Sequence, residues 1–168
     1  MAILKGIKCQ FSSHFALMAG ADSDARSEVN TAFRPPRIKD LCDQADISVE
    51  ELLLFCQCCW RHMSHYDKIL FDLCELQLNW TQGVPHGMCH NCVKLRNKVE
   101  FLCFYEATVS ATDVERETNR SIYSHEIICL KCARHLTYIE KQACVFNLEA
   151  FQKVRGSLRA LCSMCRVF

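Results

Sequence analysis

Apolar residues at helical spacing predict a series of short helices along the chain. Ile38, Leu41 and Ala45 recur every three to four residues, which places them on one face of a helix. A Ser or Thr followed three residues later by Glu forms a capping box, which marks a helix start. These signals predict further starts at Ser48 with Glu51 ahead of a helix over 52–55, Ser64 ahead of a helix through Phe71, Thr112 with Glu115, and Thr137 with Glu140.

The longest predicted helix covers residues 93–107, which contain neither glycine nor proline. One stripe of this helix holds Leu95, Val99, Leu102 and Cys103. A second, mixed stripe holds Val93, Arg96, Asn97, Glu100 and Phe104. A helix with two different faces can pack on one domain and line a cleft between two.

Alternating apolar and polar positions predict strands between the helices. Residues 76–80 alternate in this way, and Gly83 and Pro85 then turn the chain. Residues 122–128 and 151–158 are also typical of strands. Helices and strands therefore mix along the chain, which predicts an α+β fold.

Four Cys-x-x-Cys pairs follow the same order twice. Each copy has the spacing Cys-x-x-Cys-x29-Cys-x-x-Cys. The offset from Cys56 to Cys129 also separates each of the remaining three cysteines of the first copy from its counterpart in the second. A Cys-x-x-Cys turn brings two thiolates onto one tetrahedral metal ion, and two such turns complete a four-sulfur zinc site. The predicted ligands are Cys56, Cys59, Cys89 and Cys92 for one ion, and Cys129, Cys132, Cys162 and Cys165 for the other. We therefore predict two structural Zn²⁺ ions per chain.

The repeat includes more than the metal ligands. Arg61-His62 corresponds to Arg134-His135, and Gly83 corresponds to Gly156, at the same offset. Cys58 corresponds to Lys131, so Cys58 is predicted not to bind metal. Each repeat is short, and small domains commonly depend on a metal or disulfide because they bury little surface.

This duplication predicts the domain organisation. The predicted organisation consists of a flexible N-terminal arm (1–37), a first zinc domain (38–92), an interdomain linker helix region (93–121) and a second zinc domain (122–168). Met18, within the arm, is a second candidate start site. Each zinc domain is expected to contain short helices and a small antiparallel sheet.

A secreted disulfide scaffold is the alternative use of the 14 cysteines. It needs an export signal, and although Lys5 and Lys8 could form a charged leader, Gln10 and His14 interrupt any apolar run after them. No stretch reaches membrane-spanning length. We therefore expect a reducing, intracellular compartment and no membrane partner.

Charge and motif spacing narrow the function. The chain has 20 basic and 19 acidic residues, and each four-thiolate zinc centre adds −2, which brings the folded chain from +1 to about −3. This balance is unlike that of a protein that holds a phosphate backbone. The basic residues in 94–98 and 155–159 nevertheless keep a nucleic-acid-binding zinc protein as the alternative.

Enzymatic activity is not expected. The histidines lack the His-x-x-x-His spacing of metallohydrolases. A redox Cys-x-x-Cys would occur singly beside a βαβ pattern, whereas this chain has four in register.

The complete cysteine pattern resembles that of the papillomavirus early protein six family. In this chain residues 93–128 separate the two Cys-x-x-Cys-x29-Cys-x-x-Cys units, and the match runs from about Ile38 to Phe168. The Val-Glu-Glu-Leu-Leu-Leu of 49–54, the Phe-Asp of 71–72 ahead of strand 76–80, and the Lys-Val-Arg-Gly of 153–156 also match. These motifs resemble the cutaneous viruses of the family more than the high-risk mucosal ones.

The resemblance implies a viral adaptor rather than an enzyme. In the family, two zinc domains and their connecting helix enclose a groove for an acidic helix with the motif Leu-x-x-Leu-Leu. Its sources are a HECT-type ubiquitin ligase, redirected against tumour suppressors, and the Notch co-activator Mastermind. The resemblance also implies host nucleus and host cytoplasm as locations, weak DNA binding, and a homodimer formed through the first domain.

Carried onto matching positions, the resemblance places the peptide-binding groove at Leu76, Val93, Arg96, Asn97 and Arg155. Many members carry arginines where this chain has Ile128 and Ser157, so we expect Arg96 and Arg155 to supply the positive edge instead. Without the resemblance, the alternatives are core packing for Leu76 and Val93 and solvated or strand-anchoring roles for the two arginines.

The carboxyl-terminal residues do not match a PDZ ligand. The chain stops three residues after Cys165, and Arg166 stands where such a ligand has Ser or Thr. No PDZ partner is therefore expected.

Overall fold

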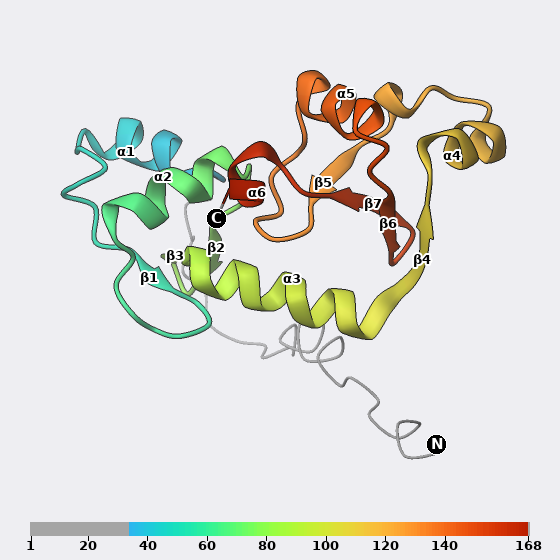
Figure 1. The fold of residues 1–168 in the computed structure, drawn as a ribbon. Coiled ribbons are helices and arrows are strands. Elements are labelled where there is room, and N and C mark those ends of the chain that lie inside the picture. The colour runs from blue at the N-terminus through green and yellow to red at the C-terminus, as the bar shows by residue number, and fades with distance from the viewer. Residues whose placement is uncertain (1–33, 168) are drawn as a thin grey trace, which may run out of the picture. The chain divides into compact units, whose positions relative to one another are not determined.

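The computed structural model describes residues 34–167 (Figure 1). Most of the predicted N-terminal arm, with Cys9 and Met18, lies outside these residues. Residues 34–37 of the arm are described, and Pro35 is buried there. The Pro35 carbonyl accepts a hydrogen bond of 3.1 Å from the indole nitrogen of Trp80, which fixes this end of the arm to the first sheet.

The first half of the fold consists of short helices around a small sheet. Its elements are α1 (Ile38–Ala45), β1 (Phe55–Cys56), α2 (His65–Leu73), β2 (Asn79–Thr81) and β3 (Val84–Gly87). The strand order is β1-β3-β2, with β2 antiparallel and β1 parallel to β3. Ile38, Leu54, Met63 and Phe71 are central to its buried core.

The second half repeats this plan after a long helix, α3 (His90–Phe104), which runs from the first sheet to the second (Figure 1). Its elements are β4 (Tyr105–Val109), α4 (Ala111–Thr118), the 3-10 helix η2 (Ile122–Ser124), β5 (Ile127–Cys129), α5 (Tyr138–Phe146), β6 (Phe151–Val154), β7 (Ser157–Ala160) and α6 (Ser163–Val167). The strand order is β4-β6-β7-β5, with β5 parallel to β7. The predicted α+β class is confirmed, and each sheet adds a parallel strand to the expected antiparallel hairpin.

The backbone repeats together with the sequence. Residues with left-handed φ recur at the repeat offset, in the pairs Trp60 and Ala133, Glu75 and Leu148, Gln82 and Arg155, and Gly83 and Gly156. The last two pairs form the two-residue turns of the β2–β3 and β6–β7 hairpins. Positive φ at both turn positions matches the right-handed twist of the strands, and glycine adopts it without strain.

A buried lysine and its repeat counterpart hold the loop ahead of each first cysteine pair. Lys68 Nζ donates to the carbonyl oxygens of Val49 and Leu52. In the second half, Lys141 Nζ donates to carbonyl oxygens of η2 and of His125, the latter at 2.6 Å. An ammonium group tolerates burial only with such acceptors, so each lysine fixes the path of its loop.

The capping box at Ser48 forms, but no helix follows it, and the predicted helix over 52–55 is wrong. The Ser48 N–H donates to the Glu51 carboxylate at 2.9 Å, and the Glu51 N–H donates to Ser48 Oγ at 3.3 Å. A helix would need the carbonyl oxygens of this segment for its own amides. Lys68 takes two of them, so tertiary contact overrides the local signal.

Two strand predictions need correction. The strand over 151–158 is divided by a left-handed turn into β6 and β7. Within 76–80 only Asn79 and Trp80 pair as strand, in β2, while Leu76 packs against the cores of both halves. Pro85 lies inside β3 rather than in the turn.

The region between the halves also differs from the prediction. α3 begins and ends three residues earlier than the predicted helix over 93–107, and β4 follows it directly and pairs with β6. Ser110 and Asp113 cap α4 instead of Thr112 and Glu115, and Glu115 accepts a hydrogen bond of 2.8 Å from the Ile122 N–H. The strand expected over 122–128 consists of η2 and the start of β5.

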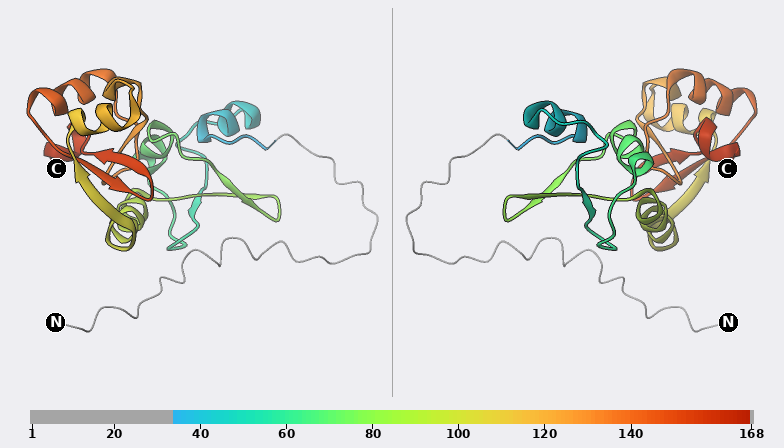
Figure 2. Two further views of the ribbon diagram at one scale, coloured as in Figure 1. Left: turned by 90° about the vertical axis from the view of Figure 1, so that its right-hand side faces the viewer. Right: turned by 90° about the vertical axis from the view of Figure 1, so that its left-hand side faces the viewer.

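The two halves pack directly on each other. Cys74, at the end of α2, belongs to the core of the second half, and Ala133 packs against the core of the first. Asn97 of α3 donates from its side-chain amide to the carbonyl oxygen of Lys131 at 3.0 Å. Two opposite side views show α2 next to the second half (Figure 2). Within residues 34–167, no helix combines the length and apolar character needed to cross a membrane.

Candidate metal centres and the interdomain pocket

The first predicted ligand set gathers at one point in the first half. Cys56 ends β1, Cys59 lies in the turn that follows, and Cys89 and Cys92 lie at the start of α3. Their four sulfur atoms are all within 4.8 Å of one another. The Sγ atoms of Cys59 and Cys89 are 3.8 Å apart.

The second ligand set forms the same arrangement in the second half, with all four cysteines buried. The Sγ atoms of Cys132 and Cys162 are 3.7 Å apart. Zinc–sulfur bonds of about 2.3 Å in a tetrahedron place sulfur atoms about 3.8 Å apart. All eight cysteines carry free thiols, and Cys58 lies outside both clusters.

A backbone amide donates to one sulfur of each cluster. The Cys89 N–H donates to Cys56 Sγ at 3.4 Å, and the equivalent contact of the second half joins the Cys162 N–H to Cys129 Sγ at 3.5 Å. Burial raises the pKa of the Cys56 thiol, but amide donors, including those of Cys59 and Cys89, outweigh this effect and lower the pKa to about 6.

Two thiols of the second cluster, those of Cys129 and Cys165, resist ionisation when no cation is bound. Hydrogen bonding to Cys132, together with burial, raises the pKa of Cys129 to about 12. Burial and the neighbouring Cys129 and Cys162 raise the pKa of Cys165 to about 12. A divalent cation relieves this repulsion, because thiolates are the metal-binding form. The two clusters therefore fit the two predicted zinc ions, which are structural because all four ligands come from the protein.

A carboxylate braces each metal centre. Asp67 and Glu140, at equivalent positions, complete the capping boxes of α2 and α5. Each also accepts a backbone N–H from the residue after the third ligand of its site. These donors are His90 to Asp67 at 2.9 Å, and Ser163 to Glu140 at 2.9 Å. The carboxylates thus join the helix that follows one cysteine pair to the segment that carries the other.

Glu140 has the stronger set of partners. It is buried and also accepts from Ser163 Oγ at 2.7 Å and from the guanidinium of Arg134 at 2.5 Å. Burial alone would raise the pKa of Glu140, but the hydrogen bonds from Ser163, Thr137 and Arg134 lower it to about 2. The carboxylate is therefore ionised at neutral pH.

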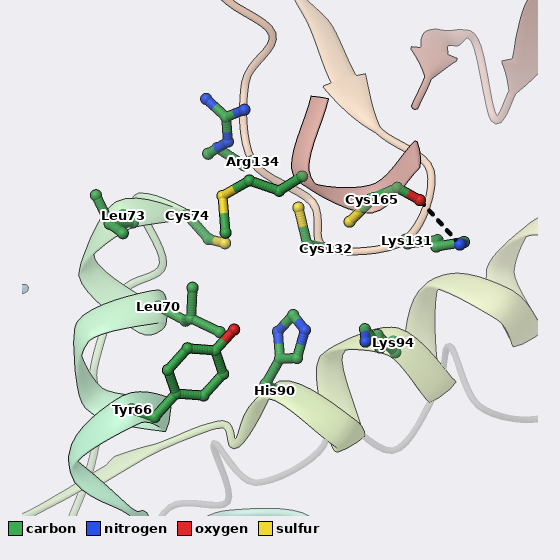
Figure 3. Close-up of a pocket in the computed structure, with 11 residues that line it drawn as sticks. Tyr66, Leu70, Leu73, Cys74, His90, Lys94, Lys131, Cys132, Arg134 and Cys165 are labelled. Carbon is green, nitrogen blue, oxygen red and sulfur yellow. Dashed lines mark hydrogen bonds between the residues drawn. The ribbon is translucent and has the colours of Figure 1, made fainter. Parts of the chain in front are cut away.

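A cavity of about 100 Å³ lies where the two halves meet (Figure 3). α2, the first turns of α3, the third cysteine pair and α6 enclose it. Its lining consists of Tyr66, Leu70, Leu73, Cys74, His90, Lys94, Lys131, Cys132, Arg134, Met164 and Cys165. The lining combines apolar leucine, tyrosine and methionine side chains with three cations.

The cations differ in their own contacts. Lys131 Nζ donates to the Cys165 carbonyl oxygen at 2.9 Å, and Arg134 is paired with Glu140. Lys94 is half-buried on α3 and faces the cavity (Figure 3). Burial, followed by the charge of Lys94, lowers the pKa of His90. Positive charge therefore dominates the rim.

The five residues predicted for the peptide groove do not line this cavity. Val93 and Asn97 are buried where α3 contacts the two halves, and Leu76 is half-buried between the cores. Arg96 and Arg155 are exposed, and the Arg155 guanidinium lies 4.8 Å from the centre of an aromatic ring at the end of α3. The structure thus divides the predicted set into three packing residues and two surface arginines.

The cavity residues of α2 could not be recognised from the sequence, because their periodicity is that of ordinary core. Leu70 is buried, but Leu73 is 54% exposed and Tyr66 is 60% exposed. Only the packing of the second half against α2 makes these side chains the lining of a cavity. The bracing role of Asp67 and Glu140 could have been recognised from the sequence, because both are acidic residues at the third position of a helix and are related by the repeat offset.

Duplicated four-cysteine units joined by one helix define a class of two-zinc proteins in which the metals maintain the fold.

The chain belongs to the papillomavirus family of early proteins: the family model described as Early Protein (E6) matches residues 55–165. The chain is 33% identical over 133 residues to Protein E6 of Human papillomavirus 9, covering 79% of this chain and 90% of that protein. It is 30% identical over 131 residues to Protein E6 of Human papillomavirus type 1 (78% and 94% covered). For Protein E6 of Canine oral papillomavirus, strain Y62, the identity is 31% over 134 residues (80% and 92% covered). The predicted family is confirmed.

Proposed function

We propose that this viral early protein is an adaptor without catalytic activity, which captures an acidic amphipathic helix carrying Leu-x-x-Leu-Leu from a host protein. The observation that supports this most directly is the cavity between the two halves, whose lining combines apolar side chains with three cations. Recognition would be of the helix-in-groove kind, in which spaced leucines anchor one face of the ligand.

The cavity has the size of an anchor point rather than of a small-molecule site. A cavity of about 150 Å³ in a protein core holds a benzene-sized ligand, and this one measures about 100 Å³. It therefore suits one aliphatic side chain. The rest of the ligand helix would lie across the exposed faces of Tyr66 and Leu73.

Charge supports an acidic ligand. The residues that line the cavity include Lys94, Lys131 and Arg134 and contain no Asp or Glu. Two of these cations already have protein partners, so Lys94 would make the principal ionic contact. These side chains would compensate for the arginines that many members of the family have where this chain carries Ile128 and Ser157.

The partners that this proposal favours are a HECT-type ubiquitin ligase, with tumour suppressors reached through it, and a Mastermind-type co-activator. Such partners would place the protein in the host nucleus and host cytoplasm. A competition pull-down between the two helices would rank them.

Fluorescence anisotropy with an acidic Leu-x-x-Leu-Leu peptide tests the proposed site. We expect micromolar binding by the zinc-loaded protein and a loss of about tenfold in Lys94→Glu, because the charge at the rim is reversed. Lys98→Glu is the matched control, since Lys98 is exposed on the same helix and does not line the cavity. Equal weakening by both variants would show a general charge effect and contradict the site.

The same assay tests the two surface arginines. If Arg96 and Arg155 supply the outer positive edge, Arg96→Glu/Arg155→Glu weakens binding further when combined with Lys94→Glu. Full binding by the double arginine variant would remove these residues from the proposal. A random DNA duplex serves as competitor, and steeply salt-dependent displacement of the peptide would favour the nucleic-acid function instead.

A further inference from the structure

The second half carries an apolar surface that is exposed to solvent in the single chain. Its side chains follow α5 and the turn after it, with exposed fractions of 75% for Ile139, 86% for Phe146 and 92% for Leu148. Gln142, which is exposed on the same helix, is uncharged. Contiguous exposed apolar surface of this kind marks a protein contact.

The internal repeat shows what the equivalent surface does in the first half. At the repeat offset, Tyr66, Leu73 and Glu75 correspond to Ile139, Phe146 and Leu148. Tyr66 and Leu73 line the cavity against the third cysteine pair, and the Glu75 carboxylate lies 4.0 Å from the His135 imidazole. The end of α2 thus packs on the cysteine turn of the other half.

The surface that receives α2 also has a repeat counterpart. It includes residues 131–135, which correspond to residues 58–62 at the first cysteine pair. In the first half this turn is open: Cys58, Trp60, Arg61 and His62 are exposed, Trp60 by 68%. Phe55, whose ring meets that of His62 edge to face, is 45% exposed.

Both members of the internal contact therefore recur as exposed surfaces, one on each half. We propose that the α5 surface (Ile139, Phe146, Leu148) of one chain docks on the first cysteine turn (Phe55, 58–62) of a second copy. The docking would follow that of α2 on the second cysteine turn (131–135) within a chain. The internal contact and the proposed contact then form one series. The rotation and translation that carry the first half onto the second half also relate successive copies.

The differences between the repeats favour this occupant. Leu148 stands on the α5 surface where α2 has the charged Glu75, and Trp60 stands on the first cysteine turn where the second has the smaller Ala133. At these two positions each surface is more apolar than its counterpart in the internal contact, while Ala143 and Asn147 stand where α2 has Leu70 and Cys74. The two changes complement each other, because Leu148 adds apolar area to the α5 surface and Trp60 adds apolar area to the first cysteine turn that would receive it.

The geometry of this contact is heterologous, because two different surfaces meet. Such contacts leave one free surface at each end and extend into rings or open chains rather than stopping at a twofold dimer. This separates the proposal from a homodimer formed through the first half alone.

Sedimentation velocity on the full zinc-loaded chain over a wide concentration range tests the proposal. We expect the average mass to rise with concentration beyond that of a dimer. Phe146→Glu and Trp60→Glu should each weaken association by at least about tenfold, because each buries a charge at the centre of the contact. Leu95→Glu, a substitution at an exposed apolar position of α3, should leave association unchanged.

Mixing the two blocked variants gives the decisive result. Phe146→Glu retains an intact first cysteine turn, and Trp60→Glu retains an intact α5 surface, so an equimolar mixture should form dimers and no larger species. A mixture that stays monomeric, a wild-type chain that stays monomeric, or dimers that survive in each variant alone would each overturn the proposal. Zinc content of two ions per chain verifies that every variant is folded.

Discussion

At the scale of single residues, Asp67 and Glu140 each have two structural roles. Each carboxylate accepts the backbone N–H of a helix N-cap and also fixes the segment that carries the second cysteine pair of its own zinc site. Because one carboxylate serves both purposes, the metal geometry and the helix cap are coupled in each half. The coupling is tighter in the second half, where Arg134 adds a charge-assisted hydrogen bond.

Glu140→Gln should lower the free energy of unfolding at pH 7 by about 2–3 kcal/mol, since it removes charge-assisted bonds from a buried site and leaves Arg134 unpaired. The pKa of Glu140 is lowered to about 2 from an ordinary value of 4.5. Its contribution is therefore complete above about pH 4.5 and is lost as pH falls towards 2. Thermal unfolding followed by circular dichroism measures the effect. Asp67→Asn is the matched control and should cost less, and an unchanged melting temperature for Glu140→Gln would contradict the bracing role.

At the scale of elements, the hairpin next to each zinc site shows how the two copies have diverged. Gly87 ends β3, and a Cβ built there would lie 2.6 Å from Met63 Sδ and 3.1 Å from a Leu54 methyl group. The equivalent position in the second half is Ala160, and the equivalent of Met63 is Leu136. In the first half the Met63 thioether occupies the space that a Cβ at position 87 would need. In the second half the shorter Leu136 leaves room for the Cβ of Ala160.

Gly87→Ala should therefore destabilise the first half by about 1–3 kcal/mol through overpacking. Adding Met63→Leu, which reproduces the pair found in the second half, should recover most of that loss. Chemical denaturation of the zinc-loaded variants measures both. If the double variant were no more stable than Gly87→Ala, another contact would limit the space at this strand end.

The element scale also shows which sequence signals were sufficient. The boxes at Ser64 and Thr137 produced α2 and α5, where no buried lysine competes for the carbonyl groups. The box at Ser48 did not produce a helix, since Lys68 takes the acceptors. Residues 105–107 fall within the predicted helix over 93–107 but belong to β4, because β6 offers a strand edge there. Local patterns predicted an element only where no distant partner competed.

At the scale of the whole molecule, the two zinc sites differ in access to solvent. All four ligands of the second site are buried, whereas Cys59, Cys89 and Cys92 of the first site are half-buried. Metal binding supplies much of the folding energy of small zinc domains. Removal of either ion should therefore unfold its own half.

A chelator that reports free zinc should release the two ions in two phases, with the first site in the fast phase because its thiolates are more accessible. Cys92→Ser should abolish the fast phase and bind one zinc ion, and Cys165→Ser should abolish the slow phase. Cys58→Ser is the control and should retain two ions, since Cys58 lies outside both clusters. A single common rate in the wild type would contradict the difference in access.

The sequence by itself determined the zinc ligands, the duplication and the family, because metal coordination requires a fixed spacing of cysteines and a repeat preserves its offset. Only the tertiary structure decided where the halves meet. The cavity joins α2 to a cysteine turn that lies far along the chain, beyond the whole of α3, and contacts at such separation leave no periodic signal. For the same physical reason, Val93 and Asn97 are packing residues, while α5 leaves in solvent the side chains equivalent to those with which α2 lines the cavity.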